Sequence, residues 1–141
     1  MPSPYVGSCL CGRVRYEFDV EPKVTVTCHC SKCRKATGSA FATWTLVAND
    51  HFRWTAGTDE IGEFNSSDHG RRFFCKQCGT TLGNLNTQWP KFMNLAAGTL
   101  DQAPSLKIKH HAYVGSKAPW YEITDSCPRF DQLPPSPKSG Q

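Results

Sequence analysis

The placement of the cysteines constrains this chain more than any other feature of its sequence. Seven of the eight cysteines fall into three short groups: Cys9 and Cys11; Cys28, Cys30 and Cys33; and Cys75 and Cys78. The middle group is followed at once by Arg34 and Lys35, and cations beside a cysteine favour the thiolate, which is the form that binds metal. Glycines adjoin the two outer groups and allow the backbone to turn tightly around an ion. The spacing therefore predicts zinc binding.

The number of clustered thiols indicates two different zinc sites. Four thiolates complete one tetrahedral site, and the other three leave a second site with a free position. A structural zinc is normally enclosed by four protein ligands, whereas a catalytic zinc keeps three and binds water or substrate at the fourth position. The alternative is two closed sites, in which His29, His69 or Cys127 supplies the eighth ligand. The count alone leaves both arrangements open.

Size, charge and hydropathy limit the other functions open to the chain. Its 141 residues have the size of one domain, and no apolar run approaches the roughly 18 residues needed to cross a membrane. No charged start followed by an apolar stretch marks a secretory signal, so we expect a reducing cytoplasm and metal binding in place of disulfides. The net charge of +4 is spread along the chain, and we therefore expect no nucleic-acid partner.

Alternating apolar residues predict a mainly β protein. Apolar and charged residues alternate from Val14 to Val20, which is typical of a half-buried strand. Further short strands are expected at residues 24–26, 41–47, 51–54, 61–64, 71–75, 80–85, 92–100 and 106–114. A single helical turn is expected at residues 31–36. We expect one zinc-binding domain over residues 1–130 and a disordered tail, rich in proline and serine, over 131–141.

Two histidines and the eighth cysteine are predicted to have structural roles. In the expected strand 106–114, His110 falls on the apolar face and His111 on the charged face, so we expect His110 to be a hydrogen-bonded core residue. His69 lies in a loop by composition and is expected to be solvated. Cys127 has no partner at the spacing of a metal site and is predicted to be a packing residue or a free thiol.

Four motifs in a fixed order allow a comparison with a known family. They are Gly-Ser-Cys9-x-Cys11-Gly12; Cys28-His29-Cys30-Ser31-x-Cys33-Arg34-Lys35; Phe74-Cys75-x-x-Cys78-Gly79-Thr80; and Gly98-Thr99-Leu100-Asp101. Over about residues 6 to 130 the chain resembles the glutathione-dependent formaldehyde-activating enzyme family. The resemblance implies an Mss4-like, zinc-stabilised fold of several short antiparallel strands with two zinc ions per chain. It implies a structural zinc on Cys9, Cys11, Cys75 and Cys78, and a catalytic zinc on Cys28, Cys30 and Cys33.

The same resemblance implies a carbon–sulfur lyase that combines glutathione with formaldehyde to give S-hydroxymethylglutathione and also runs the reverse reaction. A zinc ion with a free position can bind a thiolate or polarise an aldehyde. Arg34 and Lys35 are candidates for holding a glutathione carboxylate, and His29 for carrying a proton. Specificity is expected to lie in the loops 53–70 and 86–91. The scaffold also resembles a domain of a centromere-associated protein, so the alternative is a zinc-stabilised binding module without catalysis.

Overall fold

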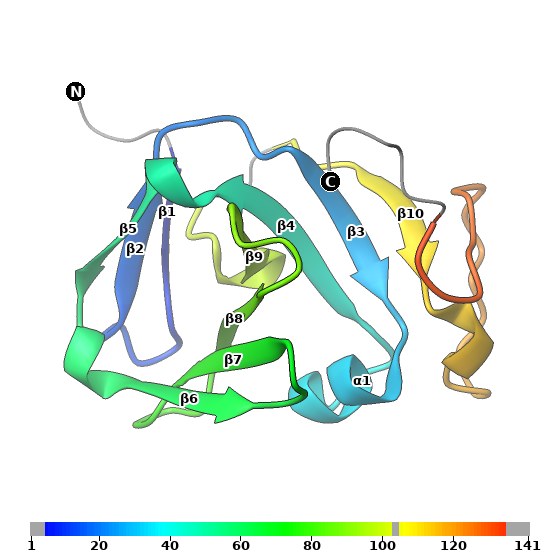
Figure 1. The fold of residues 1–141 in the computed structure, drawn as a ribbon, viewed down its shortest axis with the longest axis horizontal. Helices are drawn as coiled ribbons and strands as arrows, with labels where there is room; N and C mark the ends of the chain where they lie inside the picture. Colours follow the sequence, from blue (N-terminus) through cyan, green and yellow to red (C-terminus); the bar gives the residue numbers. More distant parts are fainter. Residues whose placement is uncertain (1–4, 103–104, 135–141) are drawn as a thin grey trace.

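The structure, a computed structural model, describes residues 5–102 and 105–134 (Figure 1). The strands are β1 (Tyr5–Ser8), β2 (Arg15–Phe18), β3 (Val24–Cys28), β4 (Ala42–Ala48), β5 (Phe52–Ala56), β6 (Ile61–Asn65), β7 (Gly70–Cys75), β8 (Thr81–Asn86), β9 (Phe92–Ala96) and β10 (Ile108–Ala112). The helices are α1 (Ser31–Thr37) and the short 3-10 helices η1 (Asn49–His51), η2 (Thr58–Glu60), η3 (Ala97–Thr99) and η4 (Val114–Ser116). Within these described ranges, none of the helices has the length and apolar character needed to span a membrane.

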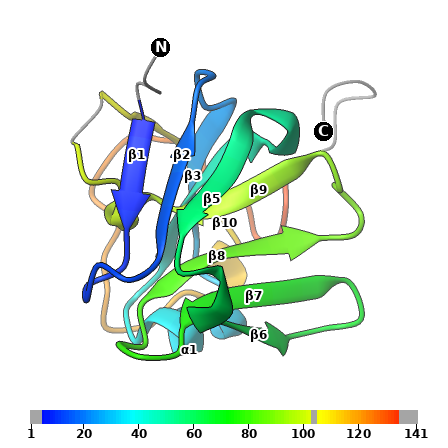
Figure 2. The same ribbon diagram turned by 90° about the vertical axis from the view of Figure 1, so that its left-hand side faces the viewer.

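The strands form two sheets, and the fold is mainly β, as the alternation predicted. The smaller sheet has the order β1-β2-β5, and the larger has the order β10-β3-β4-β9-β8-β7-β6. Pairing is antiparallel except between β10 and β3, which run parallel at one edge of the larger sheet. Figure 2 views the molecule from the side of the smaller sheet, with strands of the larger sheet behind it.

The main core lies between the two sheets. Tyr16 and Phe18 of β2 are 1% and 0% exposed and belong to the same buried cluster as Leu82 of β8 and Leu95 of β9. The hydroxyl of Tyr16 forms a 2.7 Å hydrogen bond with the hydroxyl of Thr99, so the polar end of this buried ring is satisfied. These contacts confirm that the alternation after Val14 marks a half-buried strand.

The predicted strand over residues 92–100 is shorter in the structure. β9 ends at Ala96, and η3 follows, where the Thr99 hydroxyl donates a 2.8 Å hydrogen bond to the Ala96 carbonyl. The predicted helical turn at residues 31–36 is confirmed as α1.

β10 departs from the predicted alternation, and as a result His111 is the buried histidine in place of His110. The register between β10 and β3 shifts between Ile108 and His111, which marks a bulge. The irregularity changes which side chains turn inward, so His111 and Ala112 are both buried, at 3% and 2% exposed, while His110 is only half-buried. The prediction that His110 is the core histidine and that His111 lies on the charged face is therefore wrong. β10 ends at Ala112 because the next residue, Tyr113, has a left-handed backbone with φ of 59°.

The predicted domain boundary at residue 130 stays a prediction. The main-chain N–H of Tyr113 donates to the carbonyl of Gln132 at 2.9 Å, and that of Gly115 donates to the carbonyl of Asp131 at 3.3 Å. Hydrogen bonds to the domain therefore continue past residue 130. Residues 135–141 of the predicted tail lie outside the described residues.

Candidate metal centres

The first cysteine cluster links the two sheets. Its Sγ atoms all lie within 4.8 Å of one another and belong to Cys9, Cys11, Cys75 and Cys78. Cys9 and Cys11 follow β1 of the smaller sheet, whereas Cys75 ends β7 of the larger sheet and Cys78 lies in the turn after it. All eight cysteines of the chain are free thiols. Four sulfurs gathered this closely have the chemistry and spacing of a closed zinc site, and an ion here would fasten one sheet to the other.

Local hydrogen bonds already favour thiolate in this cluster. The Thr80 hydroxyl, 3.1 Å from the sulfur, holds the pKa of Cys78 down at about 5. A backbone N–H, that of Arg13, lowers the pKa of Cys11. Burial acts in the opposite direction on Cys75 and raises its pKa to about 11. Binding a cation would offset that cost of burial, because metal binding replaces the thiol proton.

The second cysteine cluster is built on the junction between β3 and α1. Cys28 ends β3, Cys30 is the N-cap of α1, and Cys33 lies in the first turn of the helix. The Cys30 sulfur accepts a 3.3 Å hydrogen bond from the main-chain N–H of Cys33, and Gly38 closes the helix in the left-handed conformation with φ of 65°. This short capped helix brings the three Sγ atoms within 4.8 Å of one another.

Negative charge in the second cluster concentrates on its middle thiol. Hydrogen bonds from Cys28 and then from Cys33 lower the pKa of Cys30 to about 2. The same contact with Cys30 raises the pKa of Cys28. The proton left on Cys28 would be released when an ion binds, since thiolates are the ligands.

Two nitrogen donors from the larger sheet converge on Cys33. The indole Nε1 of Trp44, on β4, donates to the Cys33 sulfur at 3.4 Å, and Nη2 of Arg72, on β7, donates to it at 3.5 Å. The guanidinium of Arg72 also lies over the Trp44 ring, 5.9 Å from its centroid. Its Nε and Nη1 atoms are buried without a hydrogen-bond partner among the described residues. Arg72 therefore supplies positive charge directly beside the three thiols.

The three thiols border a cavity of about 790 Å³. Polar side chains from three neighbouring strands line the cavity side by side. In the sheet register, Arg72 of β7 lies opposite Asn84 of β8, and Asn84 lies opposite Asn94 of β9. The two asparagine amides share a 2.9 Å hydrogen bond. Other lining residues with polar side chains include Lys32, Ser66, Ser67, His69, Asn86, Gln88, Lys109, His110 and Tyr113. Within residues 5–102 and 105–134, no fourth histidine, cysteine or carboxylate joins the three thiols. The arrangement matches a metal centre with one free position next to a cavity.

Comparison with known proteins identifies the family of the chain. The sequence profile of the glutathione-dependent formaldehyde-activating enzyme family matches residues 4–116. The chain belongs to this family. A relative from Halomonas elongata, named as a candidate glutathione-dependent formaldehyde-activating enzyme, is 27% identical over 124 residues, which cover 83% of this chain and 79% of the relative. An uncharacterized lyase of Schizosaccharomyces pombe is 32% identical over 92 residues, or 64% of this chain and 65% of that protein.

The length of the match differs among these family members. The chain spans slightly less than two thirds of the Schizosaccharomyces pombe protein, and 36% of a further candidate member from Podospora anserina. A crystal structure of a Rhodobacter sphaeroides protein superposes with a TM-score of 0.61 over 71% of this chain and 91% of that protein, at 21% identity. At this identity the superposition shows a shared fold only.

The structure places the remaining predicted site residues as follows. Arg34 is not among the residues that line the cavity, and its role in substrate binding stays a prediction. His29 is completely buried, with Nε2 at 3.1 Å from Nδ1 of His111, and its Nδ1 has no partner among the described residues. His69 is exposed in its loop, as predicted, and also lines the cavity. The loops 53–70 and 86–91 both contribute to the lining, through Ser66 and Trp89 among others.

Two residues beside the cysteine cavity were missed by sequence reasoning. Arg72 reads as one of two arginines at the start of a strand, and only the sheet register shows that it faces the cavity while Arg71 pairs with Glu63 in solvent. Tyr113 reads as part of a strand, whereas its left-handed backbone ends β10 beside the cavity. The only sequence signal for Arg72 was its place three residues before Cys75, next to an identical arginine.

We expect the Arg72→Met variant to hold metal at the three-thiol centre about tenfold more weakly than the wild type. The guanidinium donates to Cys33 and balances the negative charge of three thiolates, and loss of such outer contacts typically lowers metal affinity by about 10–100-fold. Competition with a chromogenic chelator measures the change. Arg71→Met is the matched control, because Arg71 is half-exposed and pairs with Glu63. Equal affinities in the two variants would contradict a role for Arg72 at this centre.

Proposed function

We propose that the chain is a zinc-dependent carbon–sulfur lyase acting on a glutathione–aldehyde adduct of the S-hydroxymethylglutathione type. The observation that carries the proposal is the three-thiol cluster of Cys28, Cys30 and Cys33, which faces a cavity and has no fourth ligand among the described residues. Family membership and the names of the relatives support the same chemistry. A second zinc, on Cys9, Cys11, Cys75 and Cys78, has a structural role in this proposal.

The donor set fits zinc. Thiolate sulfur is a preferred ligand of zinc, and sites with three protein ligands are typical of catalytic zinc. When bound, the ion supplies Lewis acidity, and it lowers the pKa of a thiol or water at its free position. Cys28, Cys30 and Cys33 would hold it, and Arg72 would limit the negative charge that the thiolates place on the centre.

Residues of the cavity have the chemistry to bind a small anionic peptide. Lys32 and Lys109 line the cavity with Arg72 and can pair with carboxylates, while Asn86 and Gln88 can exchange hydrogen bonds with peptide groups. These side chains would orient the substrate so that its sulfur meets the carbonyl carbon of the aldehyde. This positioning supplies part of the rate enhancement, because it replaces random encounters between two reactants.

The reaction forms one carbon–sulfur bond and moves one proton. The thiol sulfur adds to the aldehyde carbon, the carbon–oxygen π bond opens, and the proton lost by the thiol is balanced by the proton gained by the oxygen. Tyr113 borders the cavity and keeps its hydroxyl proton, because burial and then the nearby Cys28 raise its pKa. Its O–H can therefore donate to the oxygen on which negative charge develops. The reverse reaction uses the same groups in the opposite order.

We place the protein in a reducing compartment such as the cytoplasm. All eight cysteines are free thiols in the structure, and the two proposed centres require seven of them in that state.

The direct test is exchange spectroscopy by NMR on ¹³C-formaldehyde and glutathione at neutral pH. We expect the zinc-loaded protein to raise the rate of exchange between free formaldehyde and its glutathione adduct in proportion to protein concentration. Protein treated with a chelator until one zinc is lost should leave only the spontaneous rate. Binding of the adduct without faster exchange would favour the alternative, a zinc-stabilised binding module, and would reject the lyase.

A further inference from the structure

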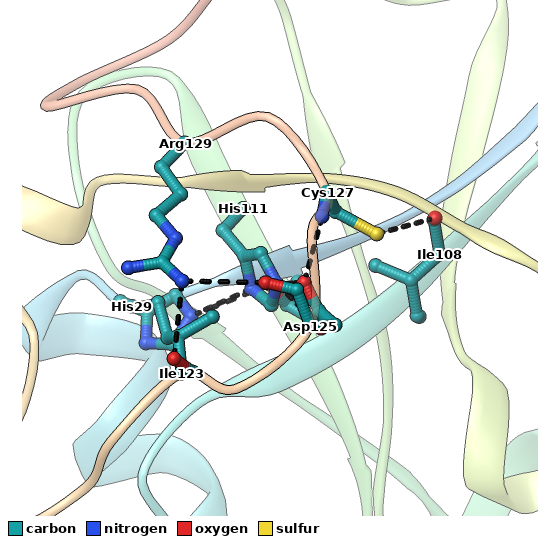
Figure 3. A network of polar contacts seen from close by, with 8 residues as sticks. His29, Ile108, His111, Ile123, Asp125, Cys127 and Arg129 are labelled. Atoms are coloured by element: carbon teal, nitrogen blue, oxygen red, sulfur yellow. Dashed lines mark hydrogen bonds and ion pairs between the residues drawn. The ribbon is translucent and has the colours of Figure 1, made fainter.

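A third group of metal-binding side chains lies outside both cysteine clusters. A ring nitrogen of His111, a carboxylate oxygen of Asp125 and Sγ of Cys127 all lie within 4.8 Å of one another (Figure 3). Cys127 was predicted to be a packing residue or a free thiol because it has no cysteine near it in sequence. Its two neighbours in the group are a histidine and an aspartate, and the histidine lies on β10, sixteen residues earlier in the sequence.

The main chain holds these three residues together. His111 lies just beyond the bulge of β10, and Asp125 and Cys127 belong to the irregular segment that follows η4. The N–H of His111 donates to the carbonyl of Pro128 at 2.9 Å, and the N–H of Phe130 donates to the carbonyl of His111 at 2.9 Å. The N–H of Cys127 in turn donates to Oδ1 of Asp125 at 2.9 Å. The three ligand atoms are thus brought together on a defined backbone.

The imidazole of His111 has the environment of a metal ligand. One ring nitrogen, Nδ1, is 2.5 Å from the hydroxyl of Thr27, and the other, Nε2, is 3.0 Å from both carboxylate oxygens of Asp125. Metal-bound histidines usually have such a partner on the second nitrogen, because it fixes the tautomer and the ring orientation. In the tautomer in which Nδ1–H donates to Thr27, the lone pair of Nε2 faces the oxygens of Asp125 and a metal ion can lie between them, whereas a proton on Nε2 makes the same contact a hydrogen bond.

The neighbouring arginine does not occupy the Asp125 carboxylate. Nη2 of Arg129 donates to the main-chain carbonyls of Ile123 and Asp125, at 3.0 and 3.3 Å, rather than to the carboxylate (Figure 3). Among the described residues, the ion pair of the Asp125 carboxylate is with His111. The His111 side chain is 4% exposed and that of Asp125 is 49% exposed, so one face of the group is buried and the other is open to an entering ion.

We propose that His111, Asp125 and Cys127 form a third metal site, which takes a divalent transition ion such as zinc. One imidazole, one carboxylate and one thiolate are all accepted zinc ligands, and the partly exposed face leaves room for water as the fourth. The ion would fasten the irregular segment around residues 123–130 to β10. Its role is therefore structural and does not depend on the proposed lyase reaction.

The test compares the number of ions bound by matched variants. Protein without an affinity tag is equilibrated with buffered free zinc and weighed intact by native mass spectrometry, with circular dichroism as the check of folding. We expect Cys127→Ser and Asp125→Asn each to bind one ion fewer than the wild type. Asp131→Asn is the control, because Asp131 is an exposed carboxylate in the same segment outside the group, and it should bind as many ions as the wild type.

The test compares the number of ions bound by each variant with the number bound by the wild type. Its result therefore does not depend on the occupancy of the two cysteine clusters. An equal number of ions in the wild type and in both variants would overturn the proposal and leave an ordinary histidine–aspartate hydrogen bond. Cobalt(II) in place of zinc gives a second readout. Absorption from thiolate-to-cobalt charge transfer should fall in Cys127→Ser and stay unchanged in Asp131→Asn, and equal spectra in the two variants would also overturn the site.

Discussion

Replacing Cys78 with serine should cost about 5 kcal/mol of stability and lower the melting temperature by about 15 °C for a chain of this size. The reason is the position of the four-thiol cluster, which joins the turn after β1 of the smaller sheet to the turn after β7 of the larger one. Structural zinc in small domains supplies about 10–16 kcal/mol of apparent binding free energy, which is comparable to the entire net stability of an ordinary domain, about 5–15 kcal/mol. Thermal unfolding followed by circular dichroism, with zinc analysis, measures the effect.

The matched control for Cys78→Ser is Lys76→Ser in the same turn. Lys76 is exposed and contributes no thiol, so its variant should melt within about 2 °C of the wild type. Prolonged chelation of the wild type should produce a melting temperature close to that of Cys78→Ser, since both remove the same ion. A melting curve of Cys78→Ser that matches the wild type would contradict the assignment of Cys9, Cys11, Cys75 and Cys78 to one structural site.

Replacing Cys30 with serine should keep the fold and lower turnover by about 10²–10³-fold. Cys30 caps α1 by accepting the N–H of Cys33, and serine is among the preferred N-cap residues, so the helix should persist. The three-thiol centre would, however, lose one of its ligands. We expect the variant to bind one ion fewer, and to lose about 3–4 kcal/mol of transition-state stabilisation that the ion supplies. The measurements are the exchange rate of the formaldehyde–glutathione adduct and the zinc content.

Ala36→Ser is the control for Cys30→Ser. It places the same hydroxyl on an exposed position of α1 outside the three-thiol cavity, and should retain both activity and metal. Full turnover in Cys30→Ser would exclude the cluster of Cys28, Cys30 and Cys33 as the reaction centre. Loss of turnover without loss of an ion would show that Cys30 acts through some route other than metal binding.

The strands and the cysteine groups were predictable because their signals are local. A half-buried strand must alternate apolar and polar side chains, and the run after Val14 does so over enough residues to identify β2. Two thiols that bind one metal ion often come from the same tight turn. The spacing of Cys75 and Cys78 therefore already indicates that they bind metal together. The family motifs then indicated which half-sites belong together, and the structure brings the sulfurs of each group within 4.8 Å of one another.

The surroundings of the three-thiol centre could not be predicted, because they depend on register between strands distant in sequence. Arg72 reaches Cys33 across 39 positions of sequence, and it does so only because β7 belongs to the same sheet as β3, the strand that leads into α1. Arg71, an identical residue next to it, points to solvent and pairs with Glu63. Composition cannot distinguish these two arginines, since a shift of one residue in register would exchange them.

The sequence by itself determined that this protein is a mainly β member of the glutathione-dependent formaldehyde-activating enzyme family with thiols grouped for metal binding. Periodicity and thiol spacing are properties of short segments, and motif order is a property of the sequence alone. All three can therefore be recognised without knowledge of the fold. Only the tertiary structure decided which histidine is buried, because a single bulge in β10 turned His111 inward and left His110 half-buried. It also decided that Asp125 and Cys127 meet His111, since side chains from separate segments converge only once the backbone hydrogen bonds have set their register.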